Sequence, residues 1–304
     1  MTILRTWKLL WLLAAGLLLQ PNAHAAGNCT VTSIAFTGVT YNNTALTATG
    51  TVNYTCSRSS NGTDGSPFTL QVTASDGLYY GSNTRNGGNG ANRLAYNLST
   101  TAAWGNGMPG LGNAHAVSVS FPTGNTDTVS GSFPFTFRIA ASLNPLSGRT
   151  YTDTVAVGGS CATAPNKNTP CTLVGATLPI SITVATTCSI TSAPGTLNMA
   201  YTSFQSIAGT GNVPFSAQCS NGGPFRMSLS PTNGTLLGVA YTLRLGTSAG
   251  SATNISSTTT YNLTGTGSAV TYYVNATAAS GQVGTCASGT CQALSPPHTL
   301  LIEY

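Results

Sequence analysis

The segment Phe133-Pro134-Phe135-Thr136-Phe137-Arg138-Ile139 places an apolar side chain at every second position. A period of two is the pattern of a β-strand that buries one face. The same alternation recurs over residues 117–121 and 178–184, and turns rich in Gly, Asn and Ser separate such segments. No segment carries the apolar stripe of an amphipathic helix, so the sequence predicts an all-β fold built from β-sandwiches.

Two parts of the chain share one arrangement, in which a pair of cysteines brackets a β-rich stretch and a Tyr-Asn-Leu triplet comes later. In the first part these are Cys29, Cys56 and Tyr96-Asn97-Leu98, and in the second Cys188, Cys219 and Tyr261-Asn262-Leu263. The triplet lies 40 residues after the second cysteine in the first part and 42 residues after it in the second. This repetition predicts a duplicated β-domain.

The two copies differ in length beyond the triplet. The first has nearly 90 further residues before the second copy begins, whereas the second has 41 and ends in the apolar run Leu300-Leu301-Ile302-Glu303-Tyr304. We therefore predict two immunoglobulin-like β-sandwich domains, residues 27–185 and 186–304, with the second lacking its last strand. Such a vacancy exposes unpaired backbone groups and an open core, which a partner's strand can fill by donor-strand complementation.

The first 26 residues are predicted to be a secretory signal peptide. Arg5 and Lys8 precede an apolar run from Leu9 to Leu19, and Ala23-His24-Ala25 provides small residues for cleavage. The apolar run is too short for a membrane span, and no later run is long enough. We therefore expect an exported protein of roughly 278 residues, a length that suits two domains.

Charged residues make up only 5% of the chain, against a usual quarter. Without Arg5 and Lys8, eight of the ten basic residues remain against five acidic ones, and Lys167 is the only lysine among them. A nucleic-acid reader needs clustered Lys and Arg, so nucleic acid is excluded as a partner. A surface poor in charge has little protection against association, which suits a protein built into an assembly.

Eight cysteines in an exported chain predict a disulfide framework. Their order and repetition favour the pairs Cys29–Cys56, Cys161–Cys171, Cys188–Cys219 and Cys286–Cys291. An alternative is that Cys286 and Cys291 bind a metal together with His298, but their spacing is not a standard zinc pattern. We therefore predict no metal and no cofactor.

Catalytic constellations are nearly absent from the sequence. Beyond residue 26 the chain has two histidines, His115 and His298, and no Gly-x-Ser-x-Gly elbow accompanies either. The five acidic residues stand singly at scattered positions, so no pair typical of glycosidases is present. The sequence predicts that the protein is not an enzyme.

Four segments of the first domain carry a family resemblance. They are Leu94-Ala95-Tyr96-Asn97-Leu98, Trp104-Gly105-Asn106-Gly107, Phe135-Thr136-Phe137-Arg138-Ile139 and Gly148-Arg149-Thr150-Tyr151-Thr152-Asp153-Thr154-Val155. In this order they resemble the spore coat protein U domain family, which includes pilins of archaic (Csu-type) chaperone–usher pili. The second domain keeps the cysteines and the triplet, but it lacks a Gly-x-Tyr-x-Asp-Thr-Val motif and carries the Cys286–Cys291 loop instead.

The resemblance implies a role in a pilus. After the predicted cleavage site the chain reaches Cys29 within two or three residues, so we expect no donor segment ahead of the first domain. Two domains without a donor extension resemble the tip adhesin of such a pilus. The implied N-terminal domain binds abiotic or host surfaces and supports attachment and biofilm formation. The implied C-terminal pilin domain accepts a strand, first from the periplasmic chaperone and then from the adjacent pilin subunit, during assembly at the outer-membrane usher.

That interpretation places the protein at a pilus tip on the cell surface, after export through the periplasm. Two alternatives stay open. The chain could be a minor or structural pilin or a coat-type surface protein, or it could be a secreted carbohydrate-binding module. A missing donor extension speaks against a position within the fibre, and an incomplete second domain speaks against a free-standing module.

Two sets of candidate site residues result from the resemblance and the alternation. The surface-binding loops, expected at the distal end of the first domain, contain Trp104, Met108, Pro109, Leu111, Leu143, Pro145 and Leu146, with the loop from Cys161 to Cys171 as a third. The acceptor groove contains Leu197, Met199, Tyr201, Leu300, Ile302 and Tyr304. Trp104 could instead pack beneath its own loop, Tyr79 and Tyr80 could stack on sugars or pack across strands, and the groove residues could be ordinary core.

Overall fold

The computed structural model describes residues 28–57, 68–121, 128–162, 172–286 and 289–304. The predicted signal peptide therefore lies outside the described residues. Every regular element within the described ranges is a β-strand, which confirms the all-β prediction. The described residues contain no helix that is long and apolar enough to span a membrane.

The described strands fall into two groups, and no ladder among them joins one group to the other. The first group, here called the N-terminal unit, contains β1 (Asn28–Ala35), β2 (Val39–Tyr41), β3 (Leu46–Ser57), β4 (Phe68–Ala74), β5 (Arg85–Asn89), β6 (Asn92–Ser99), β7 (His115–Val119), β8 (Thr128–Ile139), β9 (Arg149–Ala162) and β10 (Thr172–Val184). The second, the C-terminal unit, contains β11 (Cys188–Ser192), β12 (Gly209–Cys219), β13 (Pro224–Ser230), β14 (Asn233–Leu236), β15 (Val239–Gly246), β16 (Leu263–Thr264), β17 (Ala269–Ala278) and β18 (Thr299–Glu303).

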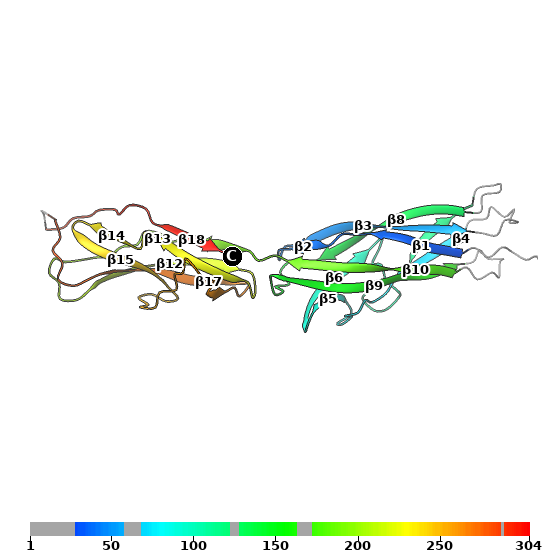
Figure 1. Ribbon diagram of the computed structural model, residues 1–304, viewed down its shortest axis with the longest axis horizontal. Helices are drawn as coiled ribbons and strands as arrows, with labels where there is room; N and C mark the ends of the chain where they lie inside the picture. Colours follow the sequence, from blue (N-terminus) through cyan, green and yellow to red (C-terminus); the bar gives the residue numbers. More distant parts are fainter. Residues whose placement is uncertain (1–27, 58–67, 122–127, 163–171, 287–288) are drawn as a thin grey trace, which may run out of the picture.

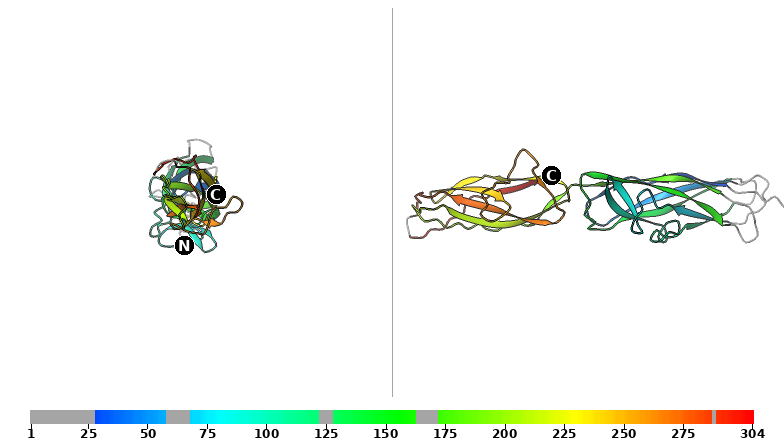
Figure 2. Two further views of the ribbon diagram at one scale, coloured as in Figure 1. Left: turned by 90° about the vertical axis from the view of Figure 1, so that its left-hand side faces the viewer. Right: turned by 90° about the horizontal axis from the view of Figure 1, so that it is seen from below.

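The two units lie end to end and give an elongated molecule (Figures 1 and 2). The predicted boundary between residues 185 and 186 falls between β10 and β11. In the N-terminal unit the strands take the order β2-β10-β1-β3-β8-β6-β5-β9-β4-β7, and β10 also pairs with β9. The C-terminal unit has a five-stranded sheet, β11-β12-β17-β15-β14, and a three-stranded sheet, β16-β13-β18. These strand orders are consistent with two β-domains, and the immunoglobulin-like detail stays a prediction.

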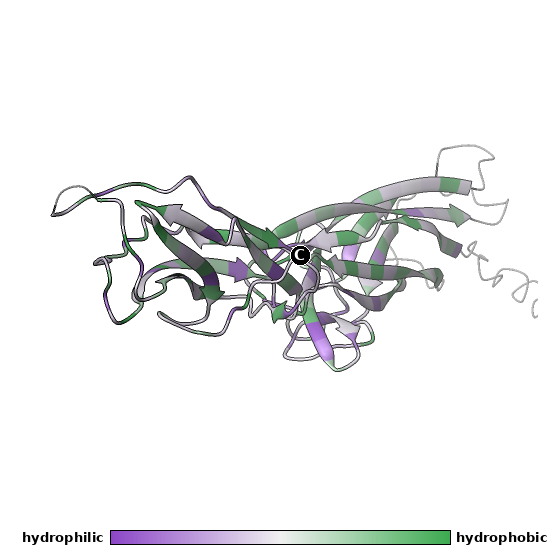
Figure 3. Cartoon of the chain, turned by 60° about the vertical axis from the view of Figure 1, so that its left-hand side comes forward, coloured by the Kyte–Doolittle hydropathy of each residue, from purple (hydrophilic) through white to green (hydrophobic). Residues whose placement is uncertain are grey.

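The alternation that predicts the strands also selects the core. Phe133, Phe135, Phe137 and Ile139 of β8 are all buried, while the residues between them face outward or are half-buried. Figure 3 shows hydrophobic bands alternating with hydrophilic ones along strands of both units. The buried side chains form two separate clusters, one in each unit, so each unit has its own core.

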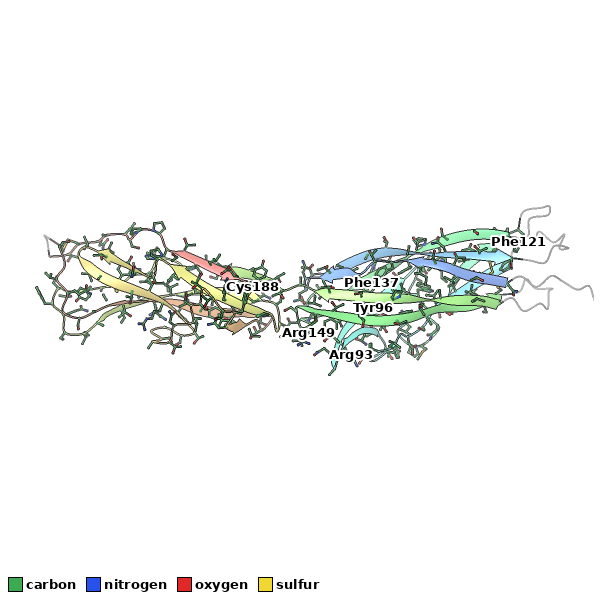
Figure 4. The ribbon with its side chains drawn as sticks, in the orientation of Figure 1. Arg93, Tyr96, Phe121, Phe137, Arg149 and Cys188 are labelled. Atoms are coloured by element: carbon green, nitrogen blue, oxygen red, sulfur yellow. A yellow bond between two sulfur atoms is a disulfide. The ribbon has the colours of Figure 1, made fainter. Side chains whose placement is uncertain are left out.

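A network of buried polar side chains crosses the core of the N-terminal unit. Tyr96 and Phe137, which are labelled in Figure 4, both belong to this core. The Arg85 guanidinium donates to the carbonyl oxygens of Ser75, Trp104 and Ala74 at 2.7, 3.0 and 2.8 Å. The Tyr96 hydroxyl donates to Asp153 at 2.6 Å. Burial raises the pKa of Tyr96, and the bond to Asp153 adds to this. Every side-chain polar atom that is fully buried in the described residues has a hydrogen-bond partner.

Replacing Arg85 tests the importance of this network. Arg85→Met removes three charge-assisted hydrogen bonds and leaves three carbonyls to be satisfied otherwise, so we expect a loss of about 3 kcal/mol or more in unfolding free energy. Trp104 is the only tryptophan after residue 26 and is fully buried, so its fluorescence during denaturant unfolding reports on the N-terminal unit.

Arg93→Met is the matched control. Arg93 is exposed and stacks on the Tyr79 ring, with its guanidinium carbon 4.3 Å from the ring centre. Its replacement is expected to change the unfolding free energy by less than about 1 kcal/mol. Equal losses for the two variants would contradict a special role for the buried network.

Candidate strand-acceptor site

The repeat that the cysteines predict is also present in the structure. Cys29 of β1 lies opposite Cys56 of β3, and Cys188 of β11 lies opposite Cys219 of β12. Both pairs are disulfide-bonded, as predicted. This common starting point lets each strand of the C-terminal unit be matched to one of the N-terminal unit: β11 to β1, β12 to β3, β13 to β4, β17 to β8 and β18 to β9.

A tyrosine near the start of each unit extends the match. The Tyr41 hydroxyl donates to the Ala140 carbonyl at 2.7 Å and accepts from the Leu143 backbone N–H at 3.4 Å. The Tyr201 hydroxyl donates to the Ala279 carbonyl at 2.9 Å and accepts from the Gln282 backbone N–H at 2.8 Å. Both acceptors come immediately after equivalent strands, β8 and β17, so the two tyrosines hold the same corner of their units.

In the N-terminal unit, β10 fills the space between the first strands and β9. It pairs in parallel with β1 from Asn28↔Thr172 and with β2 as far as Tyr41↔Val184. On its other edge it pairs antiparallel with β9 along nearly its whole length. Its inward side chains Leu178, Ile180, Ile182 and Val184 are buried in the core.

No described strand of the C-terminal unit occupies the equivalent position. There β11 pairs with β12 alone, and β18 pairs with β13 alone. Met199 and Tyr201, which match the β2 residues Val39 and Tyr41, belong to no strand. In the first unit β10 covers the backbone edges of β1, β2 and β9. The equivalent three edges of the second unit have no strand partner among the described residues. We call this position the vacant strand position.

Equivalent residues of the two units differ in solvent exposure at this position. Val31 of β1 is 5% exposed beside β10, whereas Ile190, two residues after Cys188 as Val31 is after Cys29, is 43% exposed. Cys29 is fully buried, but Cys188 is only partly buried. Apolar side chains thus remain half-open to solvent where the first unit has a closed core. Each would gain free energy from a strand placed over it, at about 25 cal/mol per Å² of apolar area.

The sequence-predicted groove residues lie around this position. Leu197, Met199, Tyr201, Leu300 and Ile302 are partly buried and pack against the core of the C-terminal unit. Tyr304 is exposed and does not join that cluster. The five partly buried residues therefore lie at the edge of the core, and their role as an acceptor groove stays a prediction.

Side chains at both ends of β18 fix its register on β13. Just before the strand, His298 bonds to the Pro231 carbonyl through Nδ1 at 2.7 Å and to the Tyr241 hydroxyl through Nε2 at 3.0 Å. At the far end, Glu303 pairs with Arg226 at 2.8 Å. The hydrogen bond from Arg226 lowers the pKa of Glu303, so the pair contributes at neutral pH and is lost as the pH falls through that lowered pKa. The edge of β18 that faces the vacant strand position is therefore held in place before any partner arrives.

The first predicted surface-binding loop lies on the flank of the N-terminal unit and not at its distal end. Gly105 accepts a backbone bond from Ala74, whose partner in β9 is Val157, halfway along that strand. Trp104 is buried in the core, and its indole N–H donates to the Val72 carbonyl at 2.9 Å. Trp104 therefore packs beneath its own loop and is not part of an exposed surface.

The other members of this loop differ in exposure. Leu111 is also buried, whereas Met108 is 38% exposed and Pro109 is exposed. The Tyr80 hydroxyl donates to the Pro109 carbonyl at 2.6 Å, which ties the loop to the preceding turn. Tyr79 stacks beneath Arg93.

The second loop was expected at the distal end, and that expectation is wrong. The Asn221 amide of the C-terminal unit donates to the Asn144 carbonyl at 3.0 Å, and Ser147 donates to the Asn221 carbonyl. Leu146 lies against Gly222. Leu143 is 39% exposed and Pro145 is partly buried in the same loop. The loop comes after β8, whose C-terminal end points toward the second unit, and the sequence alone could not show that direction.

The remaining predicted disulfides are described in part. Cys286 and Cys291 are bonded to each other, so neither offers a thiolate to a metal. Cys161 is disulfide-bonded, while its predicted partner Cys171 and the loop between them lie outside the described residues. His298, the third residue of the metal alternative, is engaged by Tyr241 and Pro231. No group of metal-ligating side chains is found among the described residues.

Comparison with known proteins finds one family match, in the N-terminal part of the chain. Residues 15–158 match the model of the Spore Coat Protein U domain. This match agrees with the resemblance to this family predicted from the motifs of the first domain. This is a family of structural and adhesive proteins, not of enzymes. The match does not extend to the C-terminal unit.

Weak structural likenesses cover more of the chain. The CsuC–CsuE chaperone–tip adhesion subunit pre-assembly complex of Acinetobacter baumannii aligns at 15% identity with a TM-score of 0.42, covering 91% of this chain and 100% of that chain. The CupB6 tip adhesin from Pseudomonas aeruginosa aligns at 9% identity with a TM-score of 0.38, covering 92% and 94%. TM-scores below 0.5 do not establish a common fold. No curated protein matches the chain.

Proposed function

We propose that the chain is the tip adhesin subunit of an archaic chaperone–usher pilus. The observation that carries the proposal is the vacant strand position between β11 and β18, which β10 fills in the first unit. A donated strand would pair in parallel with β11 and antiparallel with β18, as β10 does with β1 and β9. The Spore Coat Protein U match supports the same role, because the resemblance of the sequence to pilus subunits rests on that family.

This proposed function implies two successive strand donors. The periplasmic chaperone would supply a strand first, and the adjacent pilin subunit would replace it during assembly at the outer-membrane usher. We expect the donor to resemble β10, which has 13 residues and a large aliphatic side chain at every second position from Leu178 to Val184. The protein would be exported through the periplasm and displayed at the pilus tip on the cell surface, where the N-terminal unit binds an abiotic or host surface.

A self-complemented variant tests strand acceptance. Residues 163–184, with Ser in place of Cys171, are appended after Tyr304 so that a copy of β10 can come after β18 as β10 comes after β9. Filling the position would bury four large aliphatic side chains, so we expect the melting temperature of the C-terminal unit to rise by about 10 °C or more. Resistance of that unit to proteolysis should rise in parallel.

The matched control carries the same extension with Ser at the positions copied from Leu178, Ile180 and Ile182. It adds the same length of chain but cannot fill the core, so it should behave like the unextended protein. Identical melting curves for the two extended proteins would contradict the proposal.

We propose that the flank around Met108 and Pro109 contributes to surface binding, because these are the exposed members of the loop that lies clear of the second unit. Met108→Ser should reduce attachment of piliated cells about twofold or more while pilus assembly stays normal. Leu143→Ser is the control, since Leu143 has a similar exposed fraction but lies in the loop that contacts the second unit. Unchanged attachment of the Met108 variant would exclude this flank.

A further inference from the structure

The junction between the two units shows how a domain docks where β10 ends. The strand leaves the N-terminal unit at Val184, and β11 begins at Cys188 after a three-residue linker. The end of the unit at this point, its pole, contacts the next unit directly. Ser147 donates to the Asn221 carbonyl from its backbone N–H at 2.8 Å and from its hydroxyl at 3.1 Å. Asn144 also donates to the Thr266 carbonyl at 3.4 Å.

The same two loops build the equivalent pole of the C-terminal unit. In each unit, one loop comes after the corner tyrosine and the other comes after β8 or β17. The Ser142 N–H donates to the Asn43 carbonyl at 2.9 Å in the first unit, and the Gly281 N–H donates to the Gln205 carbonyl at 2.9 Å in the second. The loops at 202–207 and 279–284 therefore correspond to those at 42–44 and 140–148.

Three large apolar side chains are exposed in the loops of this second pole. Phe204, Ile207 and Val283 are 71%, 73% and 58% exposed. The Phe204 N–H donates to the carbonyl of Gln282, the residue before Val283, at 2.8 Å, so the backbones of the two loops meet at this point. Phe204 also has a φ of +60°, in the left-handed region that bulky residues rarely adopt. The chain thus accepts strain and exposes an aromatic ring at the same place, a combination that marks an interaction surface.

The direction of β10 predicts which part of a strand-donating partner would lie next to this pole. Because β10 runs parallel to β1 and β2, its C-terminal end lies at the pole, beside Tyr41. A strand donated in the same direction would end beside Tyr201. The chain beyond that strand would begin there, and a linker of three residues spans only about 10 Å.

We propose that Phe204, Ile207 and Val283 form the docking surface for the globular domain that comes after the donated strand in the adjacent subunit. The proposal rests on strand acceptance by the C-terminal unit and adds a second contact between the same two partners. The strand supplies backbone pairing, and the apolar pole supplies a side-on contact that fixes the angle between the subunits. The first junction uses mainly polar contacts for its covalently linked neighbour, whereas a non-covalent neighbour has to be held by buried apolar area.

Photo-crosslinking in assembled fibres tests the proposal. Benzoylphenylalanine is introduced singly at Ile190, beside the vacant strand position, at Phe204 and Val283 on the pole, and at the exposed Leu78 of the N-terminal unit as a control. Fibres are isolated from the cells in which the chain is native, and crosslinked peptides are identified by mass spectrometry. We expect Ile190 to crosslink to the strand segment of one subunit, and Phe204 and Val283 to the domain directly after that segment in the same subunit.

Two results would overturn the inference in distinguishable ways. Crosslinks at Ile190 without crosslinks from the pole to the adjoining domain would preserve strand acceptance and exclude the docking surface. No crosslink from Ile190 to any strand segment would remove strand acceptance and the docking surface with it. Crosslinks from Leu78 to the same domain would show that the reaction lacks selectivity, which also contradicts the proposal.

A double substitution measures the strength of the contact. Phe204→Asn with Val283→Asn should release the subunit from fibres about tenfold faster or more, because two large apolar side chains leave the contact. Asn is tolerated in the left-handed region, so the unit should fold at least as well as before. The paired control is Leu78→Asn with Val174→Asn, which removes equally exposed apolar residues from the N-terminal unit. Equal release rates for the two variants would exclude the docking surface.

Discussion

Backbone pairing on both edges of one strand is the constraint on which the rest of the structure depends. In the N-terminal unit β10 satisfies the polar groups of β1, β2 and β9 at once and buries its inward aliphatic side chains between them. No described strand covers the equivalent edges of β11 and β18, so their hydrogen-bonding groups need water or an added strand as a partner. The same sheet design is thus closed in one unit and open in the other.

The vacant strand position bears on the stability of the C-terminal unit and on the direction in which a strand can be added to it. Half-buried side chains such as Ile190, Leu300 and Ile302 would gain free energy from added apolar surface. Since strands have polarity, the edges also prescribe how an added strand must run, and hence at which end its own domain will sit. Under the proposed function, the vacant strand position therefore links the stability of the C-terminal unit to the direction in which a partner's strand is added.

The strands and the duplicated domain can be predicted from the sequence alone. Alternation in segments such as Phe133–Ile139 predicted strands, and the two cysteine pairs predicted the repeat, because period-two burial and close disulfide pairing are local properties. The positions of the loops in the domain, in contrast, do not depend on the local sequence alone. Whether the Leu143 loop lies at the distal end or at the junction depends on the direction of β8 within the sheet, and burial of Leu111 depends on the fold of its whole loop. The corner roles of Tyr41 and Tyr201 were missed, although the two stand 12 and 13 residues after the first cysteine of each copy.

Hydrogen exchange along β18 tests the central claim most directly. The full chain is compared alone and with a synthetic peptide of residues 172–184, and amide protection is measured in β11, β18 and, as an internal reference, β9. The account predicts that β18 and β11 exchange faster than β9 in the free chain and slow by about tenfold or more when the peptide is present, with β9 unchanged. Protection of β18 equal to that of β9 in the free chain, or no slowing with the peptide, would contradict a vacant strand position.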